Sequence, residues 1–132
     1  MFDGQAQLLK PQQLRRIQTE RIRRIVRYAY RNVPFYRKRF DEAGVKPDAI
    51  KTLEDVARIP FTVKTDLRDN YPLGILAVPQ NRLYCLHASS GTTGKPIFVA
   101  YTHGDLQRWT RLMGRTFDVA GVKKGDIVQN MY

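Results

Sequence analysis

The chain has 132 residues, which is enough for one domain with a modest core. Hydrophobic residues make up 42% and charged residues 27%, and no apolar run is long enough to span a bilayer, which excludes the class of membrane-spanning proteins. A single cysteine, Cys85, excludes an internal disulfide, and the few histidines give no support for a structural zinc site. The N-terminus has no secretory pattern, so the sequence predicts a cytoplasmic protein in which Cys85 is a buried strand thiol.

The formal net charge of +11 is concentrated in one segment. Residues 15–39 contain nine arginines and Lys38 against the single acid Glu20, so the rest of the chain is close to neutral. A charge run of this kind is usually a solvated face, but it is also typical of a surface that binds a polyanion.

Residues 12–31, which follow the start signal Pro11, are predicted to form a helix. One face is apolar, with Leu14, Ile17, Ile22, Ile25 and Ala29, and with Val26 at its margin. The opposite face carries Arg16, Arg23, Arg24, Arg27 and Arg31. Three interpretations stay open for this basic face: a solvated surface, a surface that docks onto an acidic part of a larger protein, and a nucleic-acid or membrane surface on which nearby tyrosines could stack on bases.

A second, shorter helix is predicted from Pro34 to a left-handed cap at Gly44, with Phe35, Tyr36 and Phe40 in the core. Further on, residues 52–55 resemble a capping box that starts a short helix, and Thr62 is cap-like before another brief helix. Residues 70–74 are rich in turn formers and are expected to bridge to the next part of the chain.

The second half of the chain is predicted to begin with a β-hairpin. Residues 82–88 and 97–101 are strand-like, and residues 89–96 connect them. Thr102 is then expected to cap a helix that ends at Gly121 and has an apolar face, with Leu106, Trp109, Met113, Phe117 and Ala120. Residues 127–132 are predicted to begin a further strand. The fold class expected from these elements is α/β for the whole protein and α+β for this part of it.

The connection between the strands is the most informative stretch of the chain. It consists of Ser89, Ser90, Gly91, Thr92, Thr93, Gly94, Lys95 and Pro96. Glycines allow the backbone to approach a ligand closely, successive N–H groups can surround an anion, and hydroxyls and the Lys95 ammonium add further donors. The spacing differs from the Walker loop, because only two residues separate the glycines and Pro96 follows the lysine. The pattern favours a loop that holds a polyphosphate; the alternative is a Ser/Thr/Gly-rich surface turn.

Four segments in register extend this pattern into a family resemblance. Residues 89–96 resemble the phosphate-binding loop of the adenylate-forming acyl-CoA synthetase superfamily. Together with residues 32–36, 60–64 and 67–72, they resemble the N-terminal part of the phenylacetate–coenzyme A ligases, from about Leu14 to the end of the chain. The loop alone would name the superfamily, whereas the four segments in this order name the ligases of phenylacetate catabolism.

The resemblance implies a chemistry for the complete enzyme. ATP and Mg²⁺ would be bound, the carboxylate of the acid would attack the α-phosphate to give an acyl-adenylate and pyrophosphate, and coenzyme A would displace AMP. Residues of the loop would handle the charge of the phosphates: Ser89, Ser90, Thr92 and Thr93 as donors, Gly91 and Gly94 by close approach, and Lys95 as a point charge on the β- or γ-phosphate. No catalytic residue and no metal ligand is assigned to this chain.

Lys64 and His87 each carry a weaker hypothesis. Lys64 precedes a predicted helix in a segment that resembles the ligases, and it could reach the outer phosphates; the simpler interpretation is a surface lysine. His87 adjoins the loop and could help to position the residues that bind phosphate. The simpler interpretation is a histidine that is only hydrogen-bonded in place.

The resemblance also predicts what this chain lacks. We expect an N-terminal portion, with residues 1–80 as a helical segment and residues 81–132 as the start of the AMP-binding domain, and without ligase activity of its own. Its partners would be the small-molecule substrates and the remainder of the ligase chain, and unpaired sheet edges would favour self-association. The competing hypothesis is a basic nucleic-acid-binding or interaction module built on residues 15–39.

Overall fold

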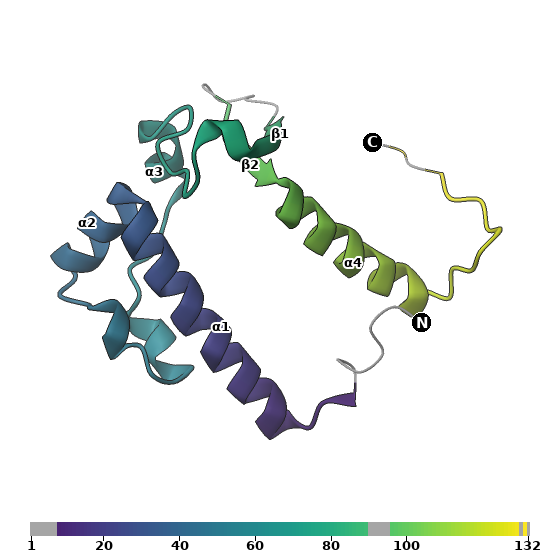
Figure 1. The fold of residues 1–132 in the computed structure, drawn as a ribbon, viewed down its shortest axis with the longest axis horizontal. Coiled ribbons are helices and arrows are strands. Elements are labelled where there is room, and N and C mark those ends of the chain that lie inside the picture. The colour runs from purple at the N-terminus through teal and green to yellow at the C-terminus, as the bar shows by residue number, and fades with distance from the viewer. Residues whose placement is uncertain (1–7, 90–95, 130, 132) are drawn as a thin grey trace.

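The computed structural model describes residues 8–89, 96–129 and 131, and Figure 1 shows their helices arranged around one two-stranded sheet. The helices are α1 (Pro11–Asn32), α2 (Pro34–Glu42), α3 (Lys64–Asp69) and α4 (His103–Val119), and the strands are β1 (Leu83–Ala88) and β2 (Phe98–Thr102). Short 3-10 turns lie at Pro47–Ala49, Glu54–Arg58 and Gln80–Arg82. The predicted α+β organisation is confirmed.

Prolines and glycines set the boundaries of the first two helices as predicted. Pro11 and Pro34 each occupy the first turn of their helix, where the missing N–H costs nothing. Val33, between the two helices, is extended at φ −121° because a residue before proline is disfavoured in the helical region. Gly44 ends the turn after α2 at φ +63°, which is the predicted left-handed conformation.

The hydrophobic core lies between α1, α2 and the turn that follows α2. Val26, Phe40, Val45 and Ile50 form its buried cluster, and Tyr30 meets Phe40 edge to face at a ring distance of 6.2 Å. Each of these side chains comes from residues 26–50, so the core is local in sequence. Of the aromatic residues predicted for this core, Phe40 is buried, whereas Phe35 and Tyr36 are half-buried.

The predicted apolar face of α1 was centred wrongly. Val26, placed at the margin from the sequence, is buried, whereas Leu14 and Ile25 are exposed. The partners of the helix cause the difference: α2 and the Pro47–Ala49 turn pack against the side of α1 that carries Ile22 and Val26, one helical turn apart. Ile25, a step of about 100° away from Val26, therefore faces outward.

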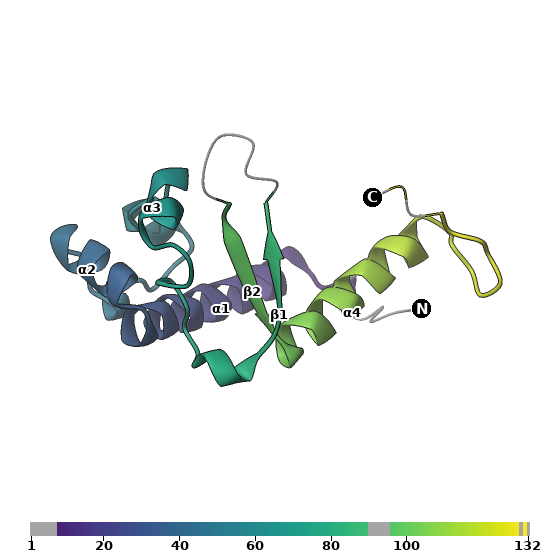
Figure 2. The same ribbon diagram turned by 90° about the horizontal axis from the view of Figure 1, so that it is seen from above.

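The second half of the molecule extends away from this core. β1 pairs with β2 antiparallel, and α4 follows β2 without a break (Figure 2). Contacts on the path to this half include the Tyr28 hydroxyl, which donates to the Ala77 carbonyl at 3.1 Å, and the Tyr71 ring, which lies 5.6 Å from that of Phe98. Among the described residues of α4 none is buried. Figure 1 accordingly shows α4 running from the hairpin on the opposite side of the molecule from α1.

The strand predicted for residues 127–132 is wrong for the part of it that the structure describes. Residues 127–129 and 131 lie in no strand, and Ile127 is almost fully exposed. A strand needs a neighbour to pair its backbone groups, and in the described ranges β1 and β2 pair only with each other. None of the described helices is long and apolar enough to cross a membrane.

Candidate functional site

The hairpin that carries the candidate phosphate loop has a defined register. Cys85 lies opposite Tyr101, and Ala88 lies opposite Phe98 at the loop end; an irregularity falls between Leu83 and Cys85. β-branched and aromatic residues favour this pleated pairing, as the sequence predicted. The strand position of Cys85 is confirmed, but its free thiol is only half-buried, in a sheet that has two strands in the described ranges.

Ser89 and Ile97 close the neck of the loop. The Ser89 N–H donates to the Ile97 carbonyl at 3.0 Å, and the Ile97 N–H donates to the Ser89 hydroxyl oxygen at 2.9 Å. The predicted binding residues Ser90, Gly91, Thr92, Thr93, Gly94 and Lys95 lie outside the described residues, so their roles stay predictions. Ser89 is therefore the one predicted phosphate-binding residue of the loop that the structure describes, and its hydroxyl oxygen acts as an acceptor in this contact.

Lys64 is the first residue of α3, and its side chain is exposed. The cap expected at Thr62 lies one residue later, at Val63, because the Asp66 carboxylate accepts the Val63 N–H at 2.8 Å. This hydrogen bond, together with an ion pair from Arg39 of α2, lowers the pKa of Asp66. Asp66 thus fixes the start of α3, from which Lys64 projects.

The start of α3 and the loop end of the hairpin lie on the same side of the molecule. Figures 1 and 2 both place α3 beside the end of the hairpin that borders residues 90–95. The Tyr71–Phe98 ring contact links the turn after α3 to the first residue of β2. No carboxylate of the described residues lies within 4 Å of the Lys64 ammonium, which leaves its charge uncompensated there.

A capping box joins β2 to α4, as the sequence predicted. The Asp105 N–H donates to the Thr102 hydroxyl oxygen at 3.2 Å, and the Thr102 N–H donates to the Asp105 carboxylate at 3.0 Å. The Thr102 hydroxyl also donates to that carboxylate at 2.7 Å, and this bond is the main reason why the pKa of Asp105 is lowered. The direction of α4 is therefore fixed relative to the hairpin.

Aromatic rings at the hairpin form a cluster that the sequence reasoning missed. Tyr101 and Trp109 stack at 5.4 Å and 24°, and the His87 ring lies 5.1 Å from Tyr101 and 5.8 Å from Trp109. Among the described residues, the His87 ring thus contacts these two rings and lies 3.9 Å from the Cys85 sulfur, and its role toward the loop stays a prediction. The register could have revealed the pair His87 and Tyr101, but the position of Trp109 depends on how α4 leaves the strand.

The basic segment is partly neutralised within the fold. Arg15 pairs with Glu54, Arg27 with Asp48 at 2.7 Å, and Arg39 with Asp66. Arg37 donates to the backbone carbonyls of Tyr30 and Arg31. The segment is thus neither a uniformly solvated face nor an uninterrupted polyanion surface. In the part of the chain that the structure describes, no three His, Cys, Asp or Glu side chains are grouped to hold a metal ion.

Comparison with known proteins bears on the whole chain. No family model matches it. It is 48% identical over all 132 residues to a phenylacetate-coenzyme A ligase of Thermus thermophilus, and 53% identical over 119 residues to one of Pseudomonas putida. The chain spans 30% and 27% of the length of these two relatives. The predicted resemblance to this ligase family is confirmed.

Solved structures give the same answer. A crystal structure of 2-hydroxyisobutyryl-CoA ligase in complex with 2-HIB-AMP and CoA superposes with a TM-score of 0.83 at 31% identity. The match covers 89% of this chain and 26% of that one. The fold described here is thus part of the fold of acyl-CoA ligases.

Proposed function

We propose that this chain is the phosphate-binding, N-terminal portion of an ATP-dependent aryl-acid–coenzyme A ligase. The premise is that the chain matches under a third of the length of a phenylacetate-coenzyme A ligase, at about half identity. The observation that carries the proposal is the closed hairpin neck, in which Ser89 and Ile97 hold the ends of a glycine- and hydroxyl-rich loop together. The likeness of this chain to a ligase that was solved with a bound acyl-adenylate also supports the proposal.

The reaction of the complete enzyme would have two steps. The acid carboxylate attacks the α-phosphate of ATP, an acyl-adenylate forms and pyrophosphate leaves; coenzyme A thiolate then attacks the acyl carbonyl and AMP leaves. Negative charge builds up on the leaving pyrophosphate, and preorganised donors stabilise it. Lys95, the hydroxyls of Ser90, Thr92 and Thr93, and the backbone at Gly91 and Gly94 are the groups that we assign to it.

The described residues fit the edge of such a site. The Ser89 hydroxyl oxygen accepts from the Ile97 N–H, and its own hydrogen would be donated to a phosphate oxygen. Lys64 brings an uncompensated ammonium from the adjacent start of α3. Mg²⁺, which would accompany ATP and neutralise its phosphates, has no ligand among the residues we assign, and coenzyme A and the acid are assigned no contact here.

The two halves of the chain would have different roles in this ligase. Residues 1–80 would form a helical support, since all the buried side chains of the described ranges lie between Val26 and Ile50. Residues 81–132 would begin the AMP-binding domain, because they contain the hairpin. Activity would require the remainder of the ligase chain.

A chimera tests the proposal directly. In the Thermus thermophilus ligase, the 132 matching residues are replaced by this chain, and pyrophosphate release from ATP and phenylacetate is measured. We expect turnover by the chimera and none by the 132-residue chain alone. Lys95→Ala should reduce turnover of the chimera by at least about tenfold, through loss of a charge-assisted contact, whereas Lys123→Ala serves as a control on an exposed lysine. Turnover by the isolated chain, or equal effects of the two substitutions, would contradict the proposal.

A further inference from the structure

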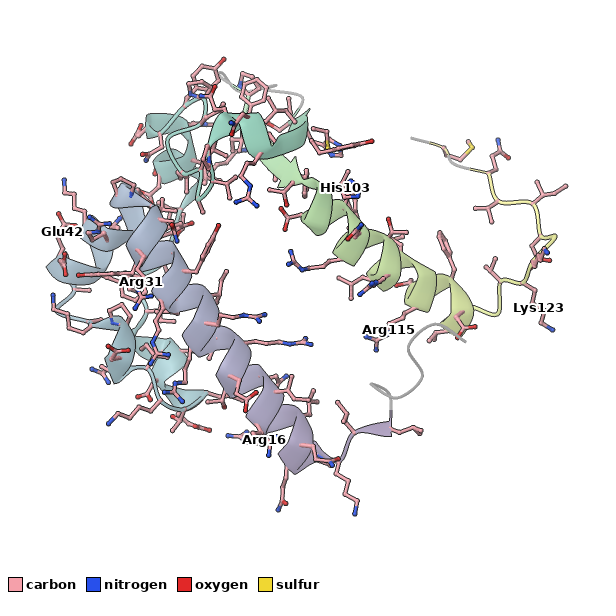
Figure 3. The ribbon with its side chains drawn as sticks, in the orientation of Figure 1. Arg16, Arg31, Glu42, His103, Arg115 and Lys123 are labelled. Carbon is pink, nitrogen blue, oxygen red and sulfur yellow. The ribbon has the colours of Figure 1, made fainter. Side chains whose placement is uncertain are left out.

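A broad groove lies between the two long helices. Its volume is about 1700 Å³, and its walls come from one face of α1 and one face of α4, with residues 75–78 and the base of the hairpin between them. Figure 1 shows the two helices on either side of this space, and in Figure 3 Arg115 extends from α4 toward α1. None of the four residues of the buried cluster lines this groove.

The lining of the groove combines positive charge with exposed apolar surface. Six arginines contribute to it, against one carboxylate, Asp105, which Arg108 already pairs at 2.9 Å. The arginines are Arg21, Arg24, Arg82, Arg108, Arg111 and Arg115. Ile25 and Leu112 line it as well, one from each helix, and their side chains are 55% and 58% exposed.

The charge of the groove indicates the chemistry of its occupant. Apart from Arg108, none of the six arginines has a carboxylate within 4 Å among the described residues. A second copy of a chain with net charge +11 would bring like charge to this surface, so the groove does not suit self-association. An occupant must carry carboxylates or phosphates toward these arginines.

The apolar residues distinguish between these two kinds of anion. Nucleic acid would satisfy the arginines through its phosphates but would leave the aliphatic side chains of Ile25, Val56 and Leu112 against a charged backbone. The Tyr28 hydroxyl is already bonded to Ala77, which anchors that ring to the wall of the groove. A polypeptide surface that carries both apolar side chains and Asp or Glu matches both parts of the lining.

We propose that the groove between α1 and α4 receives the remaining part of the ligase polypeptide, which presents apolar side chains together with carboxylates. This inference rests on the proposed function, because it assumes that the chain is joined to the rest of a ligase. The relatives are more than three times as long as this chain, so ample polypeptide exists to cover the groove. Docking there would bury Ile25 and Leu112 and would hold α4 at a fixed angle to α1.

Thiol labelling in the chimera tests this surface. Ile25→Cys and Leu112→Cys are compared with Arg16→Cys, which lies on the opposite side of α1 from Ile25, nine residues or about 900° of helix rotation away. Each is reacted with iodoacetamide under native conditions, and modification is followed peptide by peptide so that Cys85 is scored separately. We expect both groove cysteines to react at least about tenfold more slowly than Arg16→Cys, because a covered thiol reacts only when the interface opens. All three should react alike in urea.

Failure of the inference and failure of the proposed function give different results. If the chimera releases pyrophosphate but the groove cysteines react as fast as Arg16→Cys, the groove is open and the inference is overturned. If the groove cysteines are protected but the chimera is inactive, the inference stands and the proposed function fails. Protection of the groove cysteines in the isolated chain, by a second copy or by an added single-stranded oligonucleotide, would overturn the choice of occupant. A charge-reversing pair, Arg111→Glu with Arg115→Glu, should restore fast labelling of Leu112→Cys in the chimera.

Discussion

Ser89 and Ile97 are joined by two hydrogen bonds, and each residue donates one of them. The Ser89 N–H donates to the Ile97 carbonyl at 3.0 Å, and the Ile97 N–H donates to the Ser89 hydroxyl oxygen at 2.9 Å. The second bond depends on a side chain, so it can be removed without altering the strands. Ser89→Ala should therefore leave the Ile97 N–H to water, speed its hydrogen exchange and lower the free energy of unfolding by about 0.5–1.5 kcal/mol. Ser89→Thr keeps the hydroxyl and is the matched control. An unchanged exchange rate for the Ile97 amide in Ser89→Ala, measured by NMR, would show that the serine does not hold the neck.

The core is small, and Ile50 is its most deeply buried side chain, with no exposed surface. Ile50→Ala should lower the free energy of unfolding by about 2–5 kcal/mol, because it leaves a cavity among Val26, Phe40 and Val45. Ile127 is the same residue type and is 98% exposed, so Ile127→Ala should change stability by less than about 0.5 kcal/mol. Urea denaturation of the three proteins measures the difference. Similar losses for both substitutions would contradict the described core.

Gly44 and Gly104 should respond to alanine with opposite signs. Gly44 has φ +63° and open space around its Cα, so Gly44→Ala costs about 1–2 kcal/mol through backbone strain alone. Gly104 lies in the first turn of α4, where an added Cβ would meet only ordinary contacts, the nearest at 3.8 Å. Gly104→Ala should be neutral or should stabilise the chain by up to about 1 kcal/mol. Thermal melts of the two variants test the prediction, and a loss at Gly104 as large as that at Gly44 would refute it.

Asp55 should make stability depend on pH in acid. Backbone N–H groups of Lys51 and Thr52 each donate to its carboxylate at 2.9 Å, and they lower its pKa from 3.8 to about 2. Because the pKa is lower in the folded state, the carboxylate stabilises the fold above pH 3.8, and this contribution is lost as the pH falls toward about 2. The gap in unfolding free energy between the native chain and Asp55→Asn should therefore shrink between pH 4 and pH 2.

The control for this titration is Asp118→Asn. Asp118 is exposed, and its carboxylate has no hydrogen-bond partner in the described part of the chain, so this variant removes a carboxylate without removing such a contact. A gap for Asp55→Asn that stays constant from pH 4 to pH 2 would show that the two backbone donors do not control the carboxylate.

Substitution of Lys64 tests whether this lysine binds phosphate or is only an exposed surface residue. In the chimera, Lys64→Ala should weaken ATP binding or turnover by about tenfold, the size expected for one charge-assisted contact. Lys51→Ala removes an exposed lysine at a distance in sequence and should leave both unchanged. ATP titration calorimetry and pyrophosphate release measure the two effects. An unchanged ATP dissociation constant and turnover rate for Lys64→Ala would show that Lys64 is an ordinary surface lysine.

Local chemistry explains which parts of the fold could be predicted. Pro11, Pro34, Gly44 and Thr102 act on their immediate neighbours, and each of the boundaries they predicted is confirmed. The hairpin was likewise predictable from two strand-like runs around a glycine-rich turn. These signals do not depend on what packs against the segment.

Predictions that depended on distant partners were less accurate. The buried side of α1 is decided by α2, so Val26, which the sequence placed at the margin of the apolar face, is buried, whereas Ile25 of that face is exposed. Residues 127–129 have the composition of a strand but no described neighbour to pair with. The stacking of Trp109 on Tyr101 requires both the register and the path of α4, which no local pattern contains. Of the candidate site, the structure describes Ser89 and Lys64, and the roles of residues 90–95 stay predictions.

The confinement of the buried cluster to residues 26–50 has a consequence for biosynthesis. Contacts between residues close in sequence require only short loops to close, so this cluster can assemble quickly and before the hairpin leaves the ribosome. α1 and α2 would then form a scaffold on which later segments of the growing polypeptide settle. Substitutions such as Ile50→Ala should therefore slow refolding, whereas substitutions in α4 should act mainly by accelerating unfolding.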